Sequence, residues 1–392
     1  MTDRRLREEM VERVRTTLGS IHPAIAEALL DVPRHRFVPG VTAEVAYQNE
    51  AIVTKRDASG LPISSSSQPT IMAIMLDQLA PRPGDRVLEI GAGTGYNAAL
   101  ISHLVGPAGH VVTVDIDDDV VERAYANLDG YGVKVVRTDG AMGYAAGAPY
   151  DRIIATVGAW DLLPAWTAQL APGGRIVLPL DLGGTQCSVA FDRSGDEFVS
   201  RSAALCGFMR MRGAEAGPEE HTTLDGDVKV MLPWGGSVPA AVSSWLTGAE
   251  PSGAIEVDRD FPLWLGLHSR SLCTLAAPVS DVRFRDAPMQ FGDVFFTYGL
   301  LGPDGIAFVG RSVLGGGPGG PALAASLIDL ARAWYAAGRP TASNLRITAV
   351  PRSVSDGVVR SDGLAVSDGL AVSDGLVVEK RHTRLLISWD PA

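Results

Sequence analysis

The sequence predicts an α/β fold: a doubly wound, Rossmann-like parallel sheet followed by a C-terminal α+β extension. Two observations support this prediction. Apolar segments of strand length alternate with segments of helix length from residue 86 to residue 180, a pattern typical of βαβ units whose strands are buried by helices on both faces. The first strand breaks into a glycine-rich loop at Gly91, Gly93 and Gly95, where sheets of this kind bind nucleotide-type ligands.

Composition and charge narrow the class of protein. The 392 residues are 46% hydrophobic and 20% charged, so the chain is long enough for two soluble domains. A net charge of −11 offers no basic surface for a nucleic-acid backbone. The three cysteines fit neither a disulfide framework nor a metal site, and no apolar run is long enough to span a membrane. We therefore expect a cytoplasmic protein with no metal and no nucleic-acid or membrane partner.

Helices are expected ahead of the sheet. Every fourth residue from Leu6 to Leu18 is apolar, as on one face of an amphipathic helix. Pro23 is suited to the first turn of a second helix. Residues 46–62 are expected to be irregular. A further helix over 71–79 follows the serine run 64–67, in which one serine would act as the helix N-cap.

The parallel strands are expected to end at one rim of the sheet, because right-handed crossovers bring all their carboxyl ends together. The expected strands are 86–90, 110–115, 133–137, 152–155 and 175–180, with helices over 96–104, 117–128 and 162–170. Ligand-binding residues should therefore follow these strands.

The glycine loop alone does not identify the ligand. A dinucleotide fingerprint, G-x-G-x-x-G, requires glycine at position 96, but Tyr96 stands there. Glycines at 91, 93 and 95, with Glu89 two residues before them, form a spacing typical of S-adenosyl-L-methionine (SAM) methyltransferases. At this point an NAD site and a SAM site both remain open.

Residues at the ends of the next strands favour SAM. Asp115 ends the second strand, 20 residues after the last loop glycine, the spacing at which a carboxylate binds ribose hydroxyls. Asp139 and Gly140 follow the third strand, at a place suited to an adenine ring, and Thr156 follows the fourth. Residues 156–160 lack the Pro-Pro-aromatic sequence of enzymes that methylate base nitrogens, which disfavours a nucleic-acid substrate.

A set of short segments between residues 20 and 182 carries a family resemblance. They are Val32–Pro39 (VPRHRFVP), Ala46–Tyr47, Ser67–Pro69 (SQP), Pro83–Ala98 (PGDRVLEIGAGTGYNA), Asp139–Gly140, Ala148–Arg152 (APYDR) and Gln169–Arg175 (QLAPGGR). Together they resemble the protein-L-isoaspartate (D-aspartate) O-methyltransferase family. The Val-Pro-Arg-His and Gly-Tyr-Asn-Ala elements are not general methyltransferase features, so the resemblance is specific.

The resemblance implies a class I SAM-dependent methyltransferase that esterifies a protein or peptide carboxylate and releases S-adenosyl-L-homocysteine. It places Ser67 at the reacting centre, as a catalytic residue, with Gln68 and Pro69 at the substrate. The residues it implies at the cofactor are Glu89, Gly91, Gly93, Thr94, Gly95, Asn97, Asp115, Ile116, Asp139, Gly140 and Thr156. Thr70 stands where the family often has histidine, which leaves the substrate preference open.

The resemblance ends near residue 182, and roughly 200 residues follow. We expect a catalytic domain over 1–212, in which 1–80 form helices and the substrate cleft, then a linker over 213–226 and an α+β domain over 227–392. Antiparallel strands over 187–212 are expected to complete the first sheet, with later strands at 261–267, 294–298, 306–309, 345–350 and 385–389 and a helix over 322–337. The glycine-rich stretch 315–321 suits a flexible connector better than an anion-binding loop, because no lysine follows in P-loop position.

A hexapeptide repeat is the other feature of the C-terminal half. The sequence Ser-Asp-Gly begins at residues 355, 361, 367 and 373. Because Asp-Gly pairs favour tight turns, we expect a loop over 355–378 within a hairpin.

The functional prediction depends on the added C-terminal half. A similar enlarged architecture belongs to homologues encoded with ribosomal peptide natural products, such as lanthipeptides and graspetides. That resemblance predicts a macrocyclised precursor peptide as partner and substrate. One aspartate would be methylated, close to a succinimide (aspartimide) and possibly open to isoaspartate. The alternatives are repair of damaged proteins, methylation of a small-molecule carboxylate, and a non-enzymatic SAM-binding module.

Overall fold

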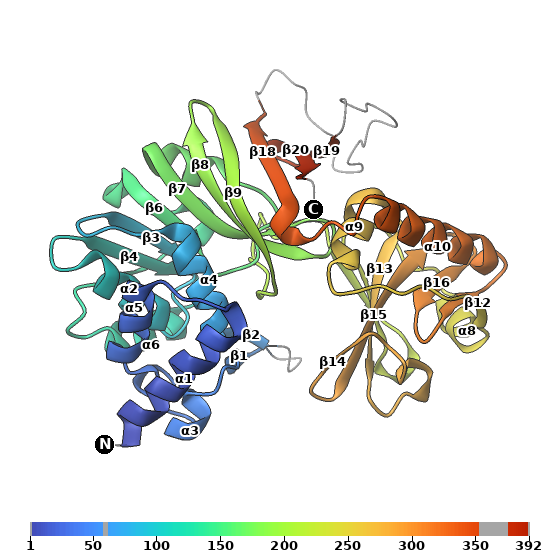
Figure 1. The fold of residues 1–392 in the computed structure, drawn as a ribbon, viewed down its shortest axis with the longest axis horizontal. Helices are drawn as coiled ribbons and strands as arrows, with labels where there is room; N and C mark the ends of the chain where they lie inside the picture. Colours follow the sequence, from blue (N-terminus) through green and yellow to red (C-terminus); the bar gives the residue numbers. More distant parts are fainter. Residues whose placement is uncertain (1, 58–61, 353–374, 391–392) are drawn as a thin grey trace.

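The computed structural model describes residues 2–57, 62–352 and 375–390. They form two lobes, each built on its own large sheet (Figure 1). Most of the predicted repeat loop lies outside the described residues. None of the helices in the described ranges is long and apolar enough to cross a membrane.

The first sheet contains the predicted parallel strands. Neighbours in the order β7-β6-β3-β4-β5 run parallel, which confirms the Rossmann-like α/β fold. The strands are β3 Arg86–Ile90, β4 His110–Asp115, β5 Lys134–Arg137, β6 Tyr150–Ala155 and β7 Leu170–Asp181, and the helices α4 Pro69–Leu79, α5 Tyr96–Val105, α6 Asp118–Asn127 and α7 Pro164–Gln169 accompany them.

The two faces of this sheet belong to separate apolar cores. Leu88 and Ile90 pack in one cluster with Trp166 of α7. Val87, the residue before Leu88, packs in the other with Leu76 of α4 and residues of the N-terminal helices. Successive strand residues point to opposite faces, so helices covering both faces explain why the strands are continuously apolar.

The first sheet is then extended by antiparallel strands, and the chain returns to it at its end. Strands β8 Gln186–Ser194 and β9 Glu197–Cys206 follow as predicted, and β18 Leu345–Pro351, β20 Thr383–Trp389 and β19 Leu376–Glu379 complete the edge. The chain therefore does not divide as predicted, because strands β18, β19 and β20 of the expected 227–392 domain lie in the first sheet. Strand β18 pairs with β9 and buries Ile347 and Ala349 in the first core, so it covers an edge that would otherwise be open.

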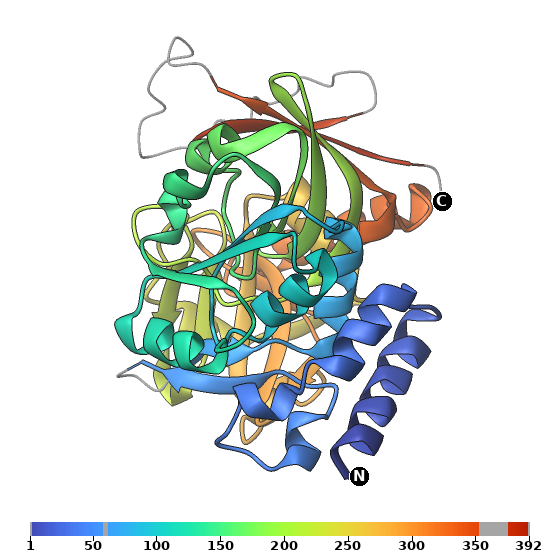
Figure 2. The ribbon, with the colours of Figure 1, turned by 90° about the vertical axis from the view of Figure 1, so that its left-hand side faces the viewer.

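The N-terminal segment covers one side of the first sheet (Figure 2). It comprises α1 Thr2–Leu18, α2 Pro23–Asp31, α3 Ala43–Ala46, β1 Ile52–Arg56 and β2 Pro62–Ser66. The prediction that residues 46–62 are irregular is wrong in part, because β1 and β2 form an antiparallel hairpin. Its strands are half-buried and polar, so the sequence shows no alternation of apolar residues that would reveal them.

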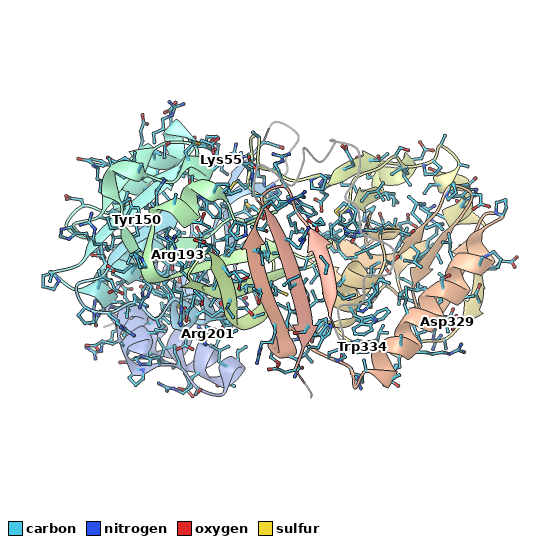
Figure 3. All side chains as sticks on the ribbon, turned by 90° about the horizontal axis from the view of Figure 1, so that it is seen from above. Lys55, Tyr150, Arg193, Arg201, Asp329 and Trp334 are labelled. Atoms are coloured by element: carbon cyan, nitrogen blue, oxygen red, sulfur yellow. The ribbon has the colours of Figure 1, made fainter. Side chains whose placement is uncertain are left out.

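The second lobe is an antiparallel sheet in the order β10-β11-β13-β15-β16-β17-β12, with β14 paired to β15. Its strands are β10 Glu220–Thr223, β11 Lys229–Leu232, β12 Glu250–Gly253, β13 Leu272–Pro278, β14 Met289–Phe291, β15 Val294–Leu301, β16 Ile306–Val309 and β17 Val313–Gly316, and its helices are α8 Val242–Thr247, α9 Phe261–His268 and α10 Gly320–Ala336. In the view from above, Asp329 and Trp334 mark α10 and Lys55 marks the first lobe (Figure 3). Strand β10 occupies part of the linker predicted over 213–226.

Two further predictions in this lobe are wrong. Residues 261–267, expected as a strand, form helix α9, because a short and wholly apolar run has no period that separates a strand from a buried helix. The glycine-rich stretch is no flexible connector: a Cβ at Gly316 would lie 2.0 Å from the Trp245 carbonyl oxygen, and one at Gly319 would lie 2.2 Å from Asp304 Oδ1. These glycines let β17 and α10 pack closely against neighbouring segments.

Candidate active site

The glycine loop joins β3 to α5 at the rim where the parallel strands end. The amides of Gly91 and Ala92 donate to the Val114 carbonyl oxygen (2.8 and 3.0 Å), which fixes the loop beside β4. A Cβ at Gly91 would lie 2.8 Å from Thr156 Oγ1, and the φ angle of +98° is unfavourable for other residues. Helix α5 starts after Gly95 without a side chain capping it from that residue. The Tyr96 amide donates to Thr94 Oγ1 (3.4 Å), and the next N–H groups and the positive dipole end face the loop, where a ligand can bind.

Asp115 lies beside this loop at the end of β4. Its Oδ2 accepts from the Gly93 amide (3.2 Å) and its Oδ1 accepts from the Ile116 amide (2.8 Å). The Ile116 side chain is 37% exposed next to this carboxylate. The structure therefore brings three features together: the carboxylate predicted to bind the ribose, an apolar side chain and the glycine loop.

Glu89 lies beneath the loop and not on its surface. Its side chain is buried, Oε1 accepts from Asn97 Nδ2 (2.8 Å), and Oε2 accepts from Thr113 Oγ1 (2.6 Å). Burial raises the pKa of Glu89 to about 7 although both hydrogen bonds oppose that shift. Because both carboxylate oxygens have protein partners, Glu89 and Asn97 brace the start of α5 from within.

The remaining predicted cofactor residues line the same rim. Asp139 Oδ1 accepts from the Ala141 amide (2.9 Å) and caps a short 3-10 turn that begins at Gly140. Thr156 Oγ1 donates to the Gly91 carbonyl oxygen (2.7 Å) and supports the loop from below. Thr94 is buried within the loop.

Ser67 follows the end of β2, which reaches the glycine loop. A Cβ at Gly93 would lie 3.4 Å from the Ser65 carbonyl oxygen, so the half-buried Ser67 stands two residues from this contact. The N-cap of α4 is Gln68, which makes no side-chain cap hydrogen bond. The interpretation of a serine as N-cap is therefore wrong. Pro69 begins the helix as expected, and Gln68 Nε2 donates to the Asn49 carbonyl oxygen (2.8 Å).

Sequence reasoning missed a salt-bridge cluster above Asp115. Asp117 Oδ2 accepts from Lys55 Nζ and from Arg212 Nη2, both at 2.8 Å. Lys55 belongs to the β1–β2 hairpin and Arg212 to the segment that follows β9, so three distant parts of the chain meet at one carboxylate. The hydrogen bonds to Asp117 and Asp119 raise the pKa of Lys55. No local pattern could reveal this cluster, since each residue is an ordinary surface charge in the sequence.

Sequence reasoning also missed Arg34 and Asn49, which bind the chain around Ser67. Arg34 is fully buried, and its Nη2 donates to the Ser67 carbonyl oxygen (3.0 Å). Asn49 Oδ1 accepts from the Thr70 amide (3.0 Å). Arg34 lies in the Val-Pro-Arg-His motif. The motif contributes to the family resemblance, but it does not show which atoms Arg34 contacts.

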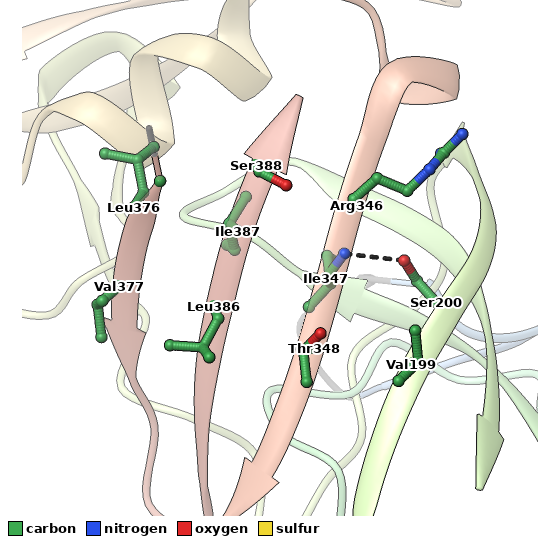
Figure 4. A pocket seen from close by; sticks show the side chains of 11 residues that line it. Val199, Ser200, Arg346, Ile347, Thr348, Leu376, Val377, Leu386, Ile387 and Ser388 are labelled. Carbon is green, nitrogen blue, oxygen red and sulfur yellow. Dashed lines mark hydrogen bonds between the residues drawn. The ribbon is translucent and has the colours of Figure 1, made fainter. Parts of the chain in front are cut away.

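A cavity of about 240 Å³ lies elsewhere, over the added strands β9, β18, β20 and β19 (Figure 4). Val199, Ile347 and Leu386 are among its lining residues, and Ser200 Oγ accepts from the Ile347 amide (2.8 Å). The sheet order separates these strands from β3 and β4. We therefore do not assign this cavity to the reaction.

The first half of the chain is similar to known proteins of one family. The family model for protein-L-isoaspartate(D-aspartate) O-methyltransferase (PCMT) matches residues 4–216. A protein-L-isoaspartate O-methyltransferase from Methanopyrus kandleri is 41% identical over 218 residues, which are 54% of this chain and 93% of that protein. One from Thermotoga maritima is 39% identical over 161 residues, which are 40% of this chain but only 50% of that protein.

One solved structure is similar over both lobes. It is titled protein-L-isoaspartate O-methyltransferase and covers 87% of this chain and 96% of its own, with a TM-score of 0.51 and 24% identity. Residues 4–216 alone cannot supply that coverage. The fold of much of the second lobe therefore recurs in a protein with that title.

Proposed function

Because the chain belongs to the protein-L-isoaspartate(D-aspartate) O-methyltransferase family of SAM-dependent enzymes, we propose that it methylates the free carboxylate of L-isoaspartyl residues in damaged proteins. The observation that carries the proposal is that β2 brings the Ser65 carbonyl oxygen against Gly93 of the glycine loop, two residues before Ser67. A SAM-binding module without activity would not require the Ser67–Pro69 segment at that place.

The precursor-peptide hypothesis now has less support. It rested on the size of the C-terminal half, but a solved protein-L-isoaspartate O-methyltransferase has the same fold over most of this chain. The extension therefore does not distinguish a peptide-maturation enzyme from a repair enzyme. A constrained precursor peptide stays as the comparison substrate in the experiment below.

The rim fits SAM by its shape and donors. Glycine at position 91 lets the loop pack against Thr156, whose Oγ1 would lie 2.8 Å from a Cβ there. The open start of α5 offers N–H groups to the carboxylate of the amino-acid part. In this proposal Asp115 binds the ribose hydroxyls, and Ile116 and the Asp139–Gly140 turn bind the adenine. When bound, SAM supplies an electrophilic methyl group.

The acceptor side makes modest chemical demands. A carboxylate is already ionised at neutral pH, so the methyl transfer needs no general base to create the nucleophile. The residues around Ser67 have to align the carboxylate with the methyl group and exclude water. Methylation makes the carboxyl a better acylating group, and attack by the next backbone nitrogen then closes a five-membered succinimide with release of methanol.

Mass spectrometry with SAM and three peptides tests the proposal. We expect an isoaspartyl peptide of arbitrary sequence to gain one methyl group and then lose methanol, and the same peptide with ordinary aspartate to stay unchanged. Methylation of only the third, a cyclised precursor encoded beside this gene, would refute the repair function. Ser67→Ala should reduce turnover more than SAM binding, whereas wild-type turnover would contradict its assigned role.

A further inference from the structure

Arg34 is a fully buried arginine that binds main-chain oxygens. Its side chain has 0% exposure. Nη1 donates to the carbonyl oxygens of Ala46 (2.7 Å) and Gln48 (3.1 Å), and Nη2 donates to that of Glu50 (2.9 Å). One side chain therefore holds every second carbonyl of the 46–50 segment, the stretch that leads into strand β1.

The same guanidinium holds the chain at Ser67. Nη2 also lies within hydrogen-bond distance of the carbonyl oxygens of Ser66 (3.3 Å) and Ser67 (3.0 Å). The β1–β2 ladder ends at the pair Ile52 and Ser66. Arg34 therefore connects residues 46–50 to residues 66 and 67 beyond the last ladder pair. The reacting segment, Ser67–Pro69, begins there.

This arrangement requires a guanidinium. A planar group with five N–H donors can serve several carbonyl oxygens at once, whereas a lysine ammonium is a single point charge with three donors. No carboxylate pairs with Arg34 within the described part of the chain, and burial lowers the pKa of its guanidinium. Burying a cation without a counter-ion is unfavourable, so a purely structural contact would be served better by neutral groups.

We propose that Arg34 is a positioning residue for methyl transfer: it holds the backbone at Ser66 and Ser67 so that the Ser67 side chain stays at the acceptor carboxylate. This inference rests on the proposed function. It adds a residue that acts through Ser67 without touching either substrate.

Asn49 supports the same segment from the other side. Its Oδ1 accepts from the amide and from the hydroxyl of Thr70 (3.0 and 2.9 Å), and its carbonyl oxygen accepts from Gln68 Nε2 (2.8 Å). The residues before and after Ser67 are thus both bound to the 46–50 segment. Asn49 has no buried charge, so a variant at this position disturbs folding less than one at Arg34.

The test compares Arg34→Lys with a matched control, Arg13→Lys. Arg13 also donates to a main-chain oxygen of this region, that of Tyr47 (2.8 Å), but not to the reacting segment. We expect Arg34→Lys to lower kcat/KM for an isoaspartyl peptide by roughly 10- to 100-fold, the loss expected when a reacting group is misplaced by about 1 Å. The affinity for SAM, measured by calorimetry, should stay unchanged, and Arg13→Lys should match the wild type in both.

A double-mutant cycle separates positioning from general stabilisation. If Arg34 acts through Ser67, then Arg34→Lys combined with Ser67→Ala loses no more activity than Ser67→Ala alone. Additive losses, or a fall in SAM affinity equal to the fall in turnover, would overturn the proposal.

Asn49→Ala keeps the proposal testable if Arg34→Lys does not fold. It should also reduce kcat/KM and be non-additive with Ser67→Ala, and wild-type kinetics in Asn49→Ala would then overturn the proposal. If the wild type itself does not methylate isoaspartyl peptides, the proposed function fails. If the wild type is active and Arg34→Lys is folded and equally active, only the role of Arg34 fails.

Discussion

Replacing Glu89 by glutamine tests the electrostatics beneath the glycine loop. The carboxyl group is fully enclosed and accepts from Asn97 and Thr113. A glutamine of the same shape keeps an acceptor for Asn97, and its amide can donate to the Thr113 hydroxyl, which also accepts. The change removes the titration of a buried acid. The Thr113 O–H and the second amide N–H then lack an acceptor, but that cost does not vary with pH.

The sign of the effect follows from the direction of the pKa shift. Burial raises the pKa of Glu89 from 4.5 to about 7, so the folded protein binds this proton more tightly than the unfolded chain. The loss of folding stability that results from ionising the buried carboxyl is absent below pH 4.5, grows as the pH rises, and is complete above pH 7. A shift of this size corresponds to about 3 kcal/mol of unfolding free energy, and Glu89→Gln should remove this pH dependence.

Urea denaturation at several pH values measures this difference. The free energy of unfolding of Glu89→Gln minus that of the wild type should increase from pH 5 to pH 8. Glu27→Gln, a change at an exposed position on α2, is the control and should show no such trend. A difference that stays constant with pH, or that falls as the pH rises, would refute the reasoning.

Two further predictions concern other buried or paired charges. Asp115→Ala should weaken SAM binding by about tenfold or more in calorimetry, because it removes the predicted ribose ligand and leaves the Gly93 amide unpaired; unchanged affinity would count against this assignment. Lys380 is buried, donates to the Asp181 carbonyl oxygen (2.6 Å) and lies 3.4 Å from the Trp160 ring centroid. Burial lowers its pKa to about 8 from 10.5. The folded state is therefore destabilised by the buried charge below pH 8, and this destabilisation disappears as the pH rises to 10.5. The wild type should therefore gain about 3 kcal/mol of unfolding free energy across that range, whereas Lys380→Met should not; equal slopes in denaturation experiments would contradict this.

Features encoded by local spacing could be predicted from the sequence. The strands from 86 to 180 and the register of Asp115 with the glycine loop depend on residues that are close in the chain and repeat with a regular period. Helix α9 escaped prediction because its residues are apolar all round. The hairpin β1–β2 escaped because its strands are polar and its pairing is not visible as alternation.

The sequence by itself determined the parallel strands from β3 to β7 and predicted a methyl-donor site, since a strand, a glycine loop and a helix N-terminus are consecutive and create their geometry locally. Only the tertiary structure decided how Ser67 is held. Arg34 binds the carbonyl oxygens of residues 46, 48, 50, 66 and 67. Every residue has a carbonyl oxygen, so the sequence does not show which of them a side chain binds. The return of β18–β20 to the first sheet is hidden for the same reason, because strand pairing joins backbones that are distant in the sequence.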